Sequence, residues 1–418
     1  MDGDSATAVR TAVAEQEALI SGSEAVAVAS KLADVDVITA YPIRPYDTMM
    51  QFVAKQIANG EQDAEYIVAE SEHSQFEIAK HANVVGARTL CGSSGVGWCY
   101  AFEAIAVTPA LRLPMLAMVG NRALDDPGAF GTEHNDALAA RDLGWMHIWV
   151  DTAQEALDTT LIAYRVAEDR RVYLPCAIST DGAFLTHSQS LVKIPPKAWV
   201  DEFLPKYDRK DLRFHPDNPI TIAPQVNEDW LMEIRRQTDQ AMRNARTVVE
   251  EAYRDFERIF HRGAARPAPD GVANPFFEEY MTDDAELVLV GMGTLSMPVK
   301  VAIRKMREKG QKVGFVRIRW FRPFDYERLG ALLSRFAAIG VADRDFSMGS
   351  PFNSGVVANE VRAALYNQPK HPPLVSFITG LGGREVTIPG VREMFEHTRK
   401  AAESGAAPND TLWIGVRA

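Results

Sequence analysis

The sequence predicts an α/β protein whose parallel sheets are covered by helices on both faces. Short apolar segments alternate along most of the chain with longer segments of helical periodicity. The apolar segments lack the polar–apolar alternation of half-buried strands, so we expect both faces of each strand to be buried. Turns rich in glycine or proline separate the segments, which is typical of strands joined by helical crossovers.

The first half of the chain holds many of these alternations. A helix is expected at 24–32. A short strand within 34–40 then runs into the turn Tyr41-Pro42-Ile43-Arg44-Pro45, where two prolines prevent a strand or helix from continuing. The next segments are predicted as a strand at 66–69, a helix from Glu72, a strand at 88–91, a glycine-rich turn at 92–97 before another helix, and strands at 114–119 and 172–178.

Three regions fall outside this alternation and divide the chain. Residues 1–20 are rich in Ala and Glu without an apolar stripe, which predicts a peripheral arm. Residues 195–224 are proline-rich and charged, which indicates a surface linker, and apolar side chains recur at helical spacing over 227–260. The expected divisions are an arm at 1–20, a first domain at 21–195, a linker with a long helix at 196–283, and a second domain at 284–418.

The second α/β unit begins near residue 285. Its apolar segments and periodic segments again alternate without a short internal repeat. They predict strands at 286–291, 312–318, 338–342 and 374–379, and helices at 296–309, 326–336 and 355–365.

The composition excludes several classes of protein. With 418 residues and a net charge of -11, the chain does not offer the basic surface that nucleic acids or anionic membranes attract. No stretch approaches the roughly 18 consecutive apolar residues of a membrane span, and the acidic N-terminus does not resemble a signal peptide. The three cysteines cannot ligate an ordinary iron–sulfur cluster alone. We expect a cytoplasmic protein with reduced, buried thiols.

Three charged residues follow successive strands and are expected at one edge of the first sheet. Arg44 lies in the double-proline turn, Glu72 begins a helix, and Arg122 follows the strand at 114–119. Two guanidiniums and one carboxylate there predict an anion site with an acid/base partner. Ordinary structural roles remain open at this point, because Glu72 can complement the helix dipole and the arginines can form surface ion pairs. Ser74 and Glu77 also have the spacing of a capping box.

Glycine-rich turns offer two further candidate sites. The turn at 92–97 lets backbone N–H groups approach a ligand, but it lacks the Lys-Ser/Thr ending of a P-loop. Gly291 and Gly293 supply only two glycines of a dinucleotide fingerprint, which leaves a nucleotide-binding dehydrogenase as a weak alternative. The nine histidines show no metal-ligand spacing, and His73 beside Glu72 is a candidate pocket residue.

Several motifs, taken together and in order, resemble the α subunit of the pyruvate:ferredoxin oxidoreductase family. The resemblance covers about residues 20–400 and implies the pyrimidine-binding domain of thiamine-diphosphate enzymes, a doubly wound parallel sheet, followed by a transketolase C-terminal-like α/β domain. The motifs are Tyr41-Pro42-Ile43-Arg44-Pro45, Glu70-Ser71-Glu72, the turn at 92–97, Gly120-Asn121-Arg122-Ala123-Leu124, the segment 316–324 and the segment 377–384.

The resemblance also implies roles for individual residues. Glu72 matches the glutamate that hydrogen-bonds N1′ of the cofactor's aminopyrimidine, and Arg122 matches the arginine that holds the substrate carboxylate. Further cofactor contacts are expected from Pro42, Ile43, Ser94 and Gly95, and no metal ligand is expected on this chain. No Gly-Asp-Gly signature is present. Mg²⁺ and the diphosphate are therefore assigned to a partner β subunit, and [4Fe-4S] clusters to γ- and δ-type partners.

Arg44 departs from the family pattern and leaves the substrate open. Pyruvate-type members usually have Thr or Ser at this position, so a second cation argues against plain pyruvate. A dicarboxylate such as oxalate would satisfy both arginines, whereas an aryl 2-oxoacid such as phenylglyoxylate could stack on one of them. Tyr41, Tyr46 and Trp98 and a general likeness to phenylglyoxylate enzymes favour the aryl acid, with coenzyme A as acyl acceptor. A structural subunit without active-site residues is the alternative from another class.

Overall fold

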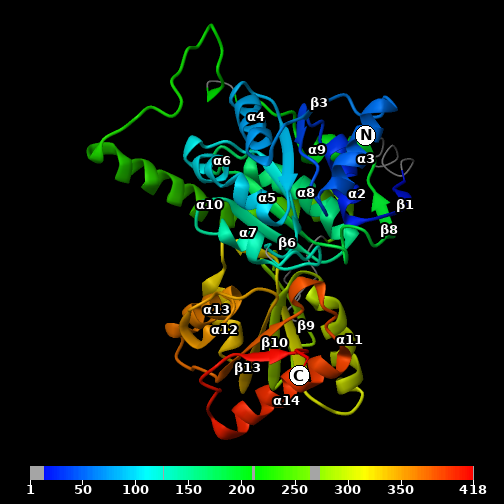
Figure 1. Cartoon of the computed structure of the whole chain (residues 1–418), viewed down its shortest axis with the longest axis vertical. Coiled ribbons are helices and arrows are strands. Elements are labelled where there is room, and N and C mark those ends of the chain that lie inside the picture. The colour runs from blue at the N-terminus through cyan, green and yellow to red at the C-terminus, as the bar shows by residue number, and fades with distance from the viewer. Residues whose placement is uncertain (1–13, 126, 210–211, 264–273, 418) are drawn as a thin grey trace, which may run out of the picture.

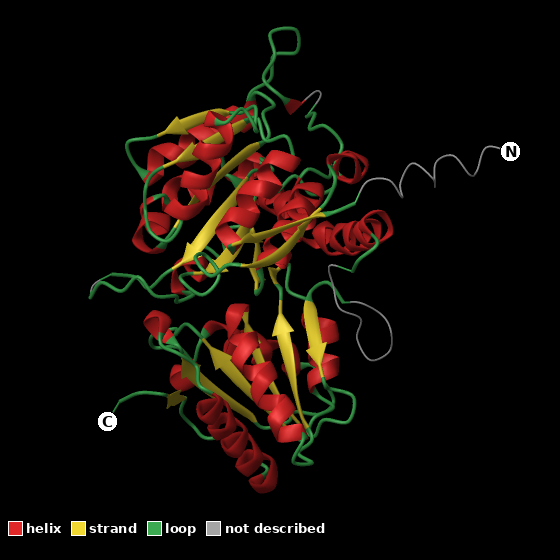
Figure 2. Ribbon diagram, turned by 90° about the vertical axis from the view of Figure 1, so that its right-hand side faces the viewer, coloured by secondary structure: helices red, strands yellow, loops and turns green. Residues whose placement is uncertain are grey.

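The computed structural model describes residues 14–125, 127–209, 212–263 and 274–417. Two sheets, each lying between helices, are stacked along the long axis of the molecule (Figures 1 and 2). The N-terminal half of the chain builds the upper body in Figure 1, and the C-terminal half builds the lower one. No described helix is long and apolar enough to cross a membrane.

The upper sheet has seven strands, all paired in parallel except β12 at one edge. Every residue of the central strands β4, β5, β6 and β7 is buried, as the continuous apolar segments predict. In spatial order the strands are β12 (Trp320–Arg322), β6 (Met146–Val150), β7 (Cys176–Asp181), β5 (Leu116–Asn121), β4 (Thr89–Ser93), β2 (Val37–Ala40) and β3 (Glu65–Val68).

Two groups of helices cover this sheet, and the helices of each group pack against one another. One group comprises α2 (Gly22–Leu32), α3 (Asp47–Ala58), α8 (Ala153–Ala167), α9 (Lys197–Phe203) and α10 (Glu228–Phe260). The other comprises α4 (Glu72–Val84), α5 (Gly95–Tyr100), α6 (Phe102–Val107) and α7 (Asn135–Ala139). The sheet is therefore doubly wound.

The lower sheet has six strands in the order β15 (Leu412–Ile414), β14 (Leu374–Thr379), β13 (Ala338–Asp343), β10 (Leu287–Met292), β11 (Val313–Ile318) and β9 (Phe277–Tyr280). Only β9 runs antiparallel to its neighbour. Two pairs of helices pack on it: α11 (Ser296–Arg307) with α14 (Ile388–Ser404), and α12 (Tyr326–Leu333) with α13 (Val356–Tyr366).

A small third sheet corrects the prediction of a peripheral arm. β1 (Gln16–Ile20) pairs antiparallel with β8 (Ser190–Ile194), so the end of the expected arm is a strand. Residues 1–13 of that arm lie outside the described residues. The expected linker at 195–224 also contains a helix, α9, and its Phe203 packs edge-on against Phe256 of α10 at 5.5 Å between ring centroids.

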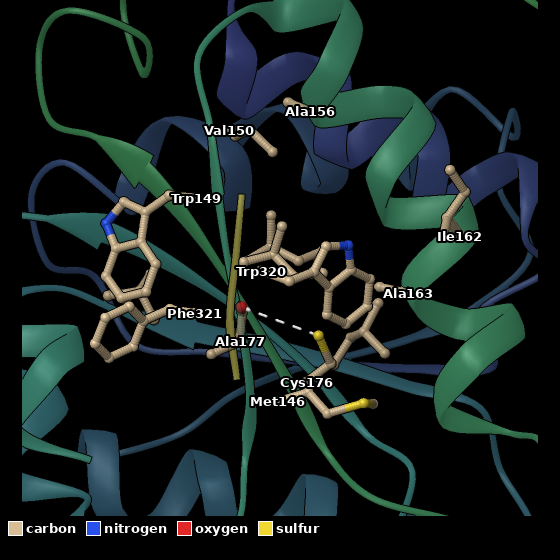
Figure 3. Close-up of a cluster of buried hydrophobic side chains, with 14 of the residues drawn as sticks. Met146, Trp149, Val150, Ala156, Ile162, Ala163, Cys176, Ala177, Trp320 and Phe321 are labelled. Carbon is tan, nitrogen blue, oxygen red and sulfur yellow. Dashed lines mark hydrogen bonds between the residues drawn. The ribbon is translucent and has the colours of Figure 1, made fainter. Parts of the chain in front are cut away.

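One hydrophobic core spans both halves of the chain, and a second, smaller one lies within the lower body. β12 belongs by sequence to the second half, yet it pairs with β6 of the upper sheet. Trp320 and Phe321 are fully buried there among side chains of β6 and β7, and the Phe321 ring lies 5.7 Å edge-on from Trp149 (Figure 3). The division of the chain into domains at residue 284 stays a prediction.

Several elements are missing from the expectations drawn from sequence. Helices α3, α8 and α14 and strands β6 and β9 were not assigned. The predicted glycine-rich turn at 92–97 is wrong in extent, because β4 continues through Ser93 and α5 begins at Gly95. Cys91 and Cys176 are buried, as expected, and burial raises the pKa of both thiols, whereas Cys99 is only half-buried.

Candidate active site

The upper sheet changes direction of winding between β2 and β4. β2 lies between β3 and β4 in the sheet. The chain continues from β2 to β3 on one side, and from β4 to β5 on the other side. Ligands of open parallel sheets bind beyond the carboxyl ends of the strands at such a point. The turn at 41–45 follows β2, Ser94 follows β4, and Arg122 follows β5.

Glu72 is the first residue of α4 and is 8% exposed. The helix is capped by Ser71, whose hydroxyl accepts a hydrogen bond from the backbone N–H of Ser74 at 3.1 Å. The possible capping box at Ser74 and Glu77 is not formed, because Ser74 already lies inside the helix. Capping by its neighbour therefore fixes the position of the Glu72 backbone.

Contacts with the sheet and with α5 hold this helix in place. The Gln75 side chain donates a hydrogen bond to the Gly92 carbonyl, and the Thr39 hydroxyl donates to the Gln75 carbonyl at 2.8 Å. The Phe76 ring packs edge-on against Trp98 of α5, with 5.5 Å between centroids. These contacts set the Glu72 carboxylate against the start of α5.

Gly97 of α5 lies directly against that carboxylate. A side chain at this position would collide with Oε1 of Glu72, and it would lie 2.7 Å from Cδ1 of Ile43 and 2.7 Å from Oγ of Ser93. Glu72, Ile43 and Ser93 therefore converge on one spot that only glycine leaves open. The side chain of Ile43 is half-buried, and that of Pro42 is exposed.

Asp136 ties the start of α5 to the end of β5. Its Oδ2 accepts hydrogen bonds from the backbone N–H groups of Gly95 at 3.0 Å and Arg122 at 2.9 Å, and its Oδ1 accepts from the Asn121 side chain at 2.9 Å. The carboxyl is fully buried, and burial raises its pKa although these donors oppose the rise. The sequence analysis missed this residue, because no motif marks a single aspartate that follows an irregular loop.

Arg122 is 6% exposed, and its guanidinium lies over Gly95, where an added side chain would come within 2.8 Å of Nε. Nη1 donates to the Arg44 carbonyl at 3.1 Å, and Nη2 donates to Oδ2 of Asp125 at 2.7 Å. The Phe130 ring covers the group at 5.3 Å. Gly95 has a φ of +52°, a conformation that a side chain would strain.

The backbone of Arg44 lies beside the Arg122 guanidinium, while the side chain of Arg44 points outward. The guanidinium is 72% exposed, and its Nε lies 3.8 Å from Oδ2 of Asp47. The Arg44 carbonyl therefore accepts a hydrogen bond from Arg122, whereas the charged end of the Arg44 side chain lies at the exposed edge, or rim, of the site. Each of the two arginines has an aspartate three residues further along the chain as its partner.

Three buried polar atoms at the carboxyl ends of β4 and β5 have no hydrogen-bond partner within the described residues. They are the hydroxyls of Ser93 and Ser94 and the Nε of Arg122. Buried polar groups are nearly always paired, so such a cluster marks a place where a polar ligand completes the hydrogen bonding. Two hydroxyls can donate or accept and the guanidinium N–H can only donate, so these groups suit a polar ligand.

His73 belongs to a different cavity from Glu72. It lines a hollow of about 560 Å³ on the outer side of α4 and α6, where its Nε2 lies 3.5 Å from Oε2 of Glu103. Among the described residues, no group of three or more His, Cys, Asp or Glu side chains is placed to hold a metal ion.

The possible nucleotide site at Gly291 and Gly293 is filled from the upper sheet. Asp181 accepts hydrogen bonds from the backbone N–H of Thr294 at 2.8 Å and from its hydroxyl, and a side chain at Gly293 would meet the same carboxylate at 2.8 Å. The Thr294 N–H beyond β10 that a phosphate would use is therefore already taken by this carboxylate. This contact does not favour the dehydrogenase alternative.

Comparison with known families matches both halves of the chain. Residues 28–254 match the family described as pyruvate flavodoxin/ferredoxin oxidoreductase, thiamine diP-binding, and residues 285–391 match pyruvate:ferredoxin oxidoreductase core domain II. The chain is 38% identical over 399 residues to pyruvate synthase subunit PorA of Methanocaldococcus jannaschii, with 96% of this chain and 98% of that protein covered. It is 32% identical to NADH-dependent phenylglyoxylate dehydrogenase subunit alpha of Aromatoleum evansii, with 99% and 98% covered.

Solved structures show the same fold. 2-Oxoglutarate:ferredoxin oxidoreductase from Magnetococcus marinus superposes with a TM-score of 0.68 at 16% identity, covering 92% of this chain and 65% of that one. A split-gene transketolase superposes with a TM-score of 0.53 at 14% identity, covering 92% and 98%. The predicted fold class is thereby confirmed.

Proposed function

Because the chain belongs to the pyruvate:ferredoxin oxidoreductase family, we propose that it is the α subunit of a thiamine-diphosphate-dependent 2-oxoacid:acceptor oxidoreductase. The reaction is R–CO–COO⁻ + CoA–SH → R–CO–S–CoA + CO₂ + H⁺ + 2e⁻. The electrons pass to [4Fe-4S] clusters on γ- and δ-type partner subunits. The observation that carries the proposal is the meeting of Glu72 and Ser93 at Gly97, with unpaired buried polar atoms at the carboxyl ends of β4 and β5.

Glu72 is the residue proposed to act on the cofactor. Thiamine diphosphate supplies a carbon nucleophile that stabilises negative charge after decarboxylation. The Glu72 carboxylate holds a proton at N1′ of the aminopyrimidine ring, and Gly97 keeps the space beside it clear. The unpaired hydroxyls of Ser93 and Ser94, the Gly95 turn, Pro42 and Ile43 are the further contacts proposed for the ring.

Arg122 is proposed to hold the substrate carboxylate. A guanidinium fork matches a carboxylate with two parallel hydrogen bonds. Its backbone is pinned by Asp136, and its Nε is buried without a partner. The group is therefore oriented before substrate arrives, which lowers the entropic cost of binding.

The charge balance at the site favours a 2-oxoacid with an uncharged tail. Arg44 and Arg122 are each paired with an aspartate. The two guanidiniums therefore carry no excess positive charge, whereas a dicarboxylate such as oxalate would need two such charges. The exposed Phe130 ring beside Arg122 offers an aromatic surface. We therefore retain an aryl 2-oxoacid such as phenylglyoxylate as the proposed substrate, with pyruvate and oxalate as its competitors.

The remaining parts of the reaction are assigned to other chains. No Gly-Asp-Gly sequence is present, so Mg²⁺ and the diphosphate are proposed to bind a β subunit that completes the site at Glu72. This division predicts that turnover requires the assembled complex. The proposed setting is the cytoplasm.

One experiment tests the proposal: turnover of the purified complex with phenylglyoxylate, pyruvate and oxalate, measured with and without thiamine diphosphate. Glu72→Gln keeps the shape of the side chain but weakens its hold on a proton, and we expect turnover to fall by about 10²-fold or more. Glu77→Gln, on the same helix, is the matched control. Near-normal turnover of Glu72→Gln would identify the chain as a structural subunit.

A further inference from the structure

Asp125 lies on a loop that closes over Arg122. The described residues 124–125 and 127–130 lie between Ala123 and Gly131, where the Ala123 N–H donates to the Gly131 carbonyl at 3.0 Å. These loop residues are exposed or half-exposed. The Asp125 carboxylate is 25% exposed, whereas the Arg122 side chain beneath it is 7% exposed.

The fork of Arg122 is half occupied by this loop. Nε and Nη2 form the edge that a carboxylate binds with two parallel bonds. Nη2 donates to Asp125 at 2.7 Å, while Nε is buried and has no partner among the described residues. A carboxylate that takes both nitrogens therefore competes with Asp125 for Nη2.

The same loop also brings an aromatic ring to the guanidinium. Phe130 lies 5.3 Å from Cζ of Arg122 and is 66% exposed. One short loop thus presents to Arg122 both a carboxylate and a ring. An aryl 2-oxoacid would likewise present a carboxylate and an aromatic ring to Arg122.

We propose that Asp125 sets the affinity of the site for its substrate, as an internal carboxylate that occupies Arg122 until a 2-oxoacid replaces it. This inference rests on the proposed function of Arg122. Exchange of one carboxylate for another keeps the buried guanidinium neutralised at every stage. Binding of every 2-oxoacid is weakened by the same factor, which is set by the fraction of molecules in which Asp125 holds the fork, so Asp125 tunes the working substrate concentration of the site.

The test compares the assembled complex carrying Asp125→Asn with the wild type. The probe is oxamate, an unreactive compound that keeps the carboxylate and the neighbouring carbonyl, and its Kd is measured by calorimetry. We expect the Kd of oxamate and the KM of the best 2-oxoacid to fall on the order of tenfold, with kcat changed less than about twofold. Glu103→Gln, which removes one exposed charge from α6, controls for general electrostatic attraction of anions.

A double-variant comparison separates competition from other effects. In the Arg122→Lys background, Asp125→Asn should no longer change the Kd of oxamate, because the fork that both carboxylates share is gone. An unchanged or raised Kd in Asp125→Asn alone, with turnover still dependent on Glu72, would overturn only the role of Asp125. Turnover that needs neither Glu72 nor thiamine diphosphate would overturn the proposed function instead.

Discussion

Gly97 lies so close to the Glu72 carboxylate that no side chain fits between them. The relationship joins two helices, because Glu72 begins α4 and Gly97 lies in the first turn of α5. It also explains the glycine at position 97, because a side chain there would collide with the carboxylate. The contact makes the position of Glu72 sensitive to a single methyl group.

Gly97→Ala should therefore displace Glu72 while leaving its chemistry intact. A shift of about 1 Å in a catalytic group can cost about 10²-fold in rate, and we expect a loss of that order in kcat of the assembled complex. The control is Gly390→Ala in α14, where an added Cβ meets nothing nearer than 3.2 Å. Full activity of Gly97→Ala would show that Glu72 does not need this space.

Asp136→Asn should disturb both sides of the site at once. An amide has one acceptor oxygen, so either the N–H groups of Gly95 and Arg122, which share Oδ2, or the Asn121 amide and the Ala137 N–H, which share Oδ1, lose their acceptor. We expect KM for the 2-oxoacid to rise about tenfold, and a larger effect on kcat/KM than on kcat. Steady-state kinetics of the complex check this, with Asp142→Asn, an exposed aspartate, as the control. Equal falls in kcat and kcat/KM would assign Asp136 to a different role.

Arg44→Thr tests the departure from the family pattern. If the guanidinium reaches the substrate, its loss should weaken the present substrate by about 1–3 kcal/mol and improve pyruvate. The ratio of kcat/KM for phenylglyoxylate and pyruvate measures the change. Because this side chain is 72% exposed beside Asp47, an unchanged ratio would place it outside the substrate pocket.

Asp181→Asn should loosen the junction between the two sheets. Burial opposes its ionisation, but His134 and Arg344 hold the pKa of Asp181 below its usual range, with contacts of 2.8 Å and 2.7 Å. Removing one partner of a buried ion pair costs about 3–5 kcal/mol. We expect a clearly lower thermal midpoint of the complex, measured by calorimetry, and little change in Asp142→Asn.

Glu133 should make stability fall as pH rises. Burial, with Asp136 and Asp345 nearby, raises its pKa from 4.5 to about 7, although His134 and the Gly382 N–H oppose this. Between these pH values the folded form binds a proton that the unfolded form has lost, so stability declines through this window and levels off above it. Glu133→Gln should become more stable relative to the wild type from pH 5 to pH 7.5. A constant difference in thermal midpoint would contradict the shift.

The sequence located most strands and several helices well. The strand at 374–379 and the start of the helix at Glu72 agree with the structure residue for residue, because continuous apolar segments and capping residues act locally. Helix α8 was not predicted, although Gln154, Asp158 and Arg165 recur at helical spacing along it. Strand β12 could not be assigned to the upper sheet, since its partner β6 lies far away in the chain.

By itself, the sequence determined the fold class, the alternation of strands and helices, and the family, through motifs whose residues are neighbours in the chain. Only the tertiary structure decided which side chains meet: Glu72 with Gly97, Asp136 with Gly95 and Arg122, and Arg44 with Asp47 at the rim. Local patterns fix strands and helices, because hydrogen bonding and burial repeat with a short period. Contacts between elements depend on packing across the whole sheet, which no short pattern records.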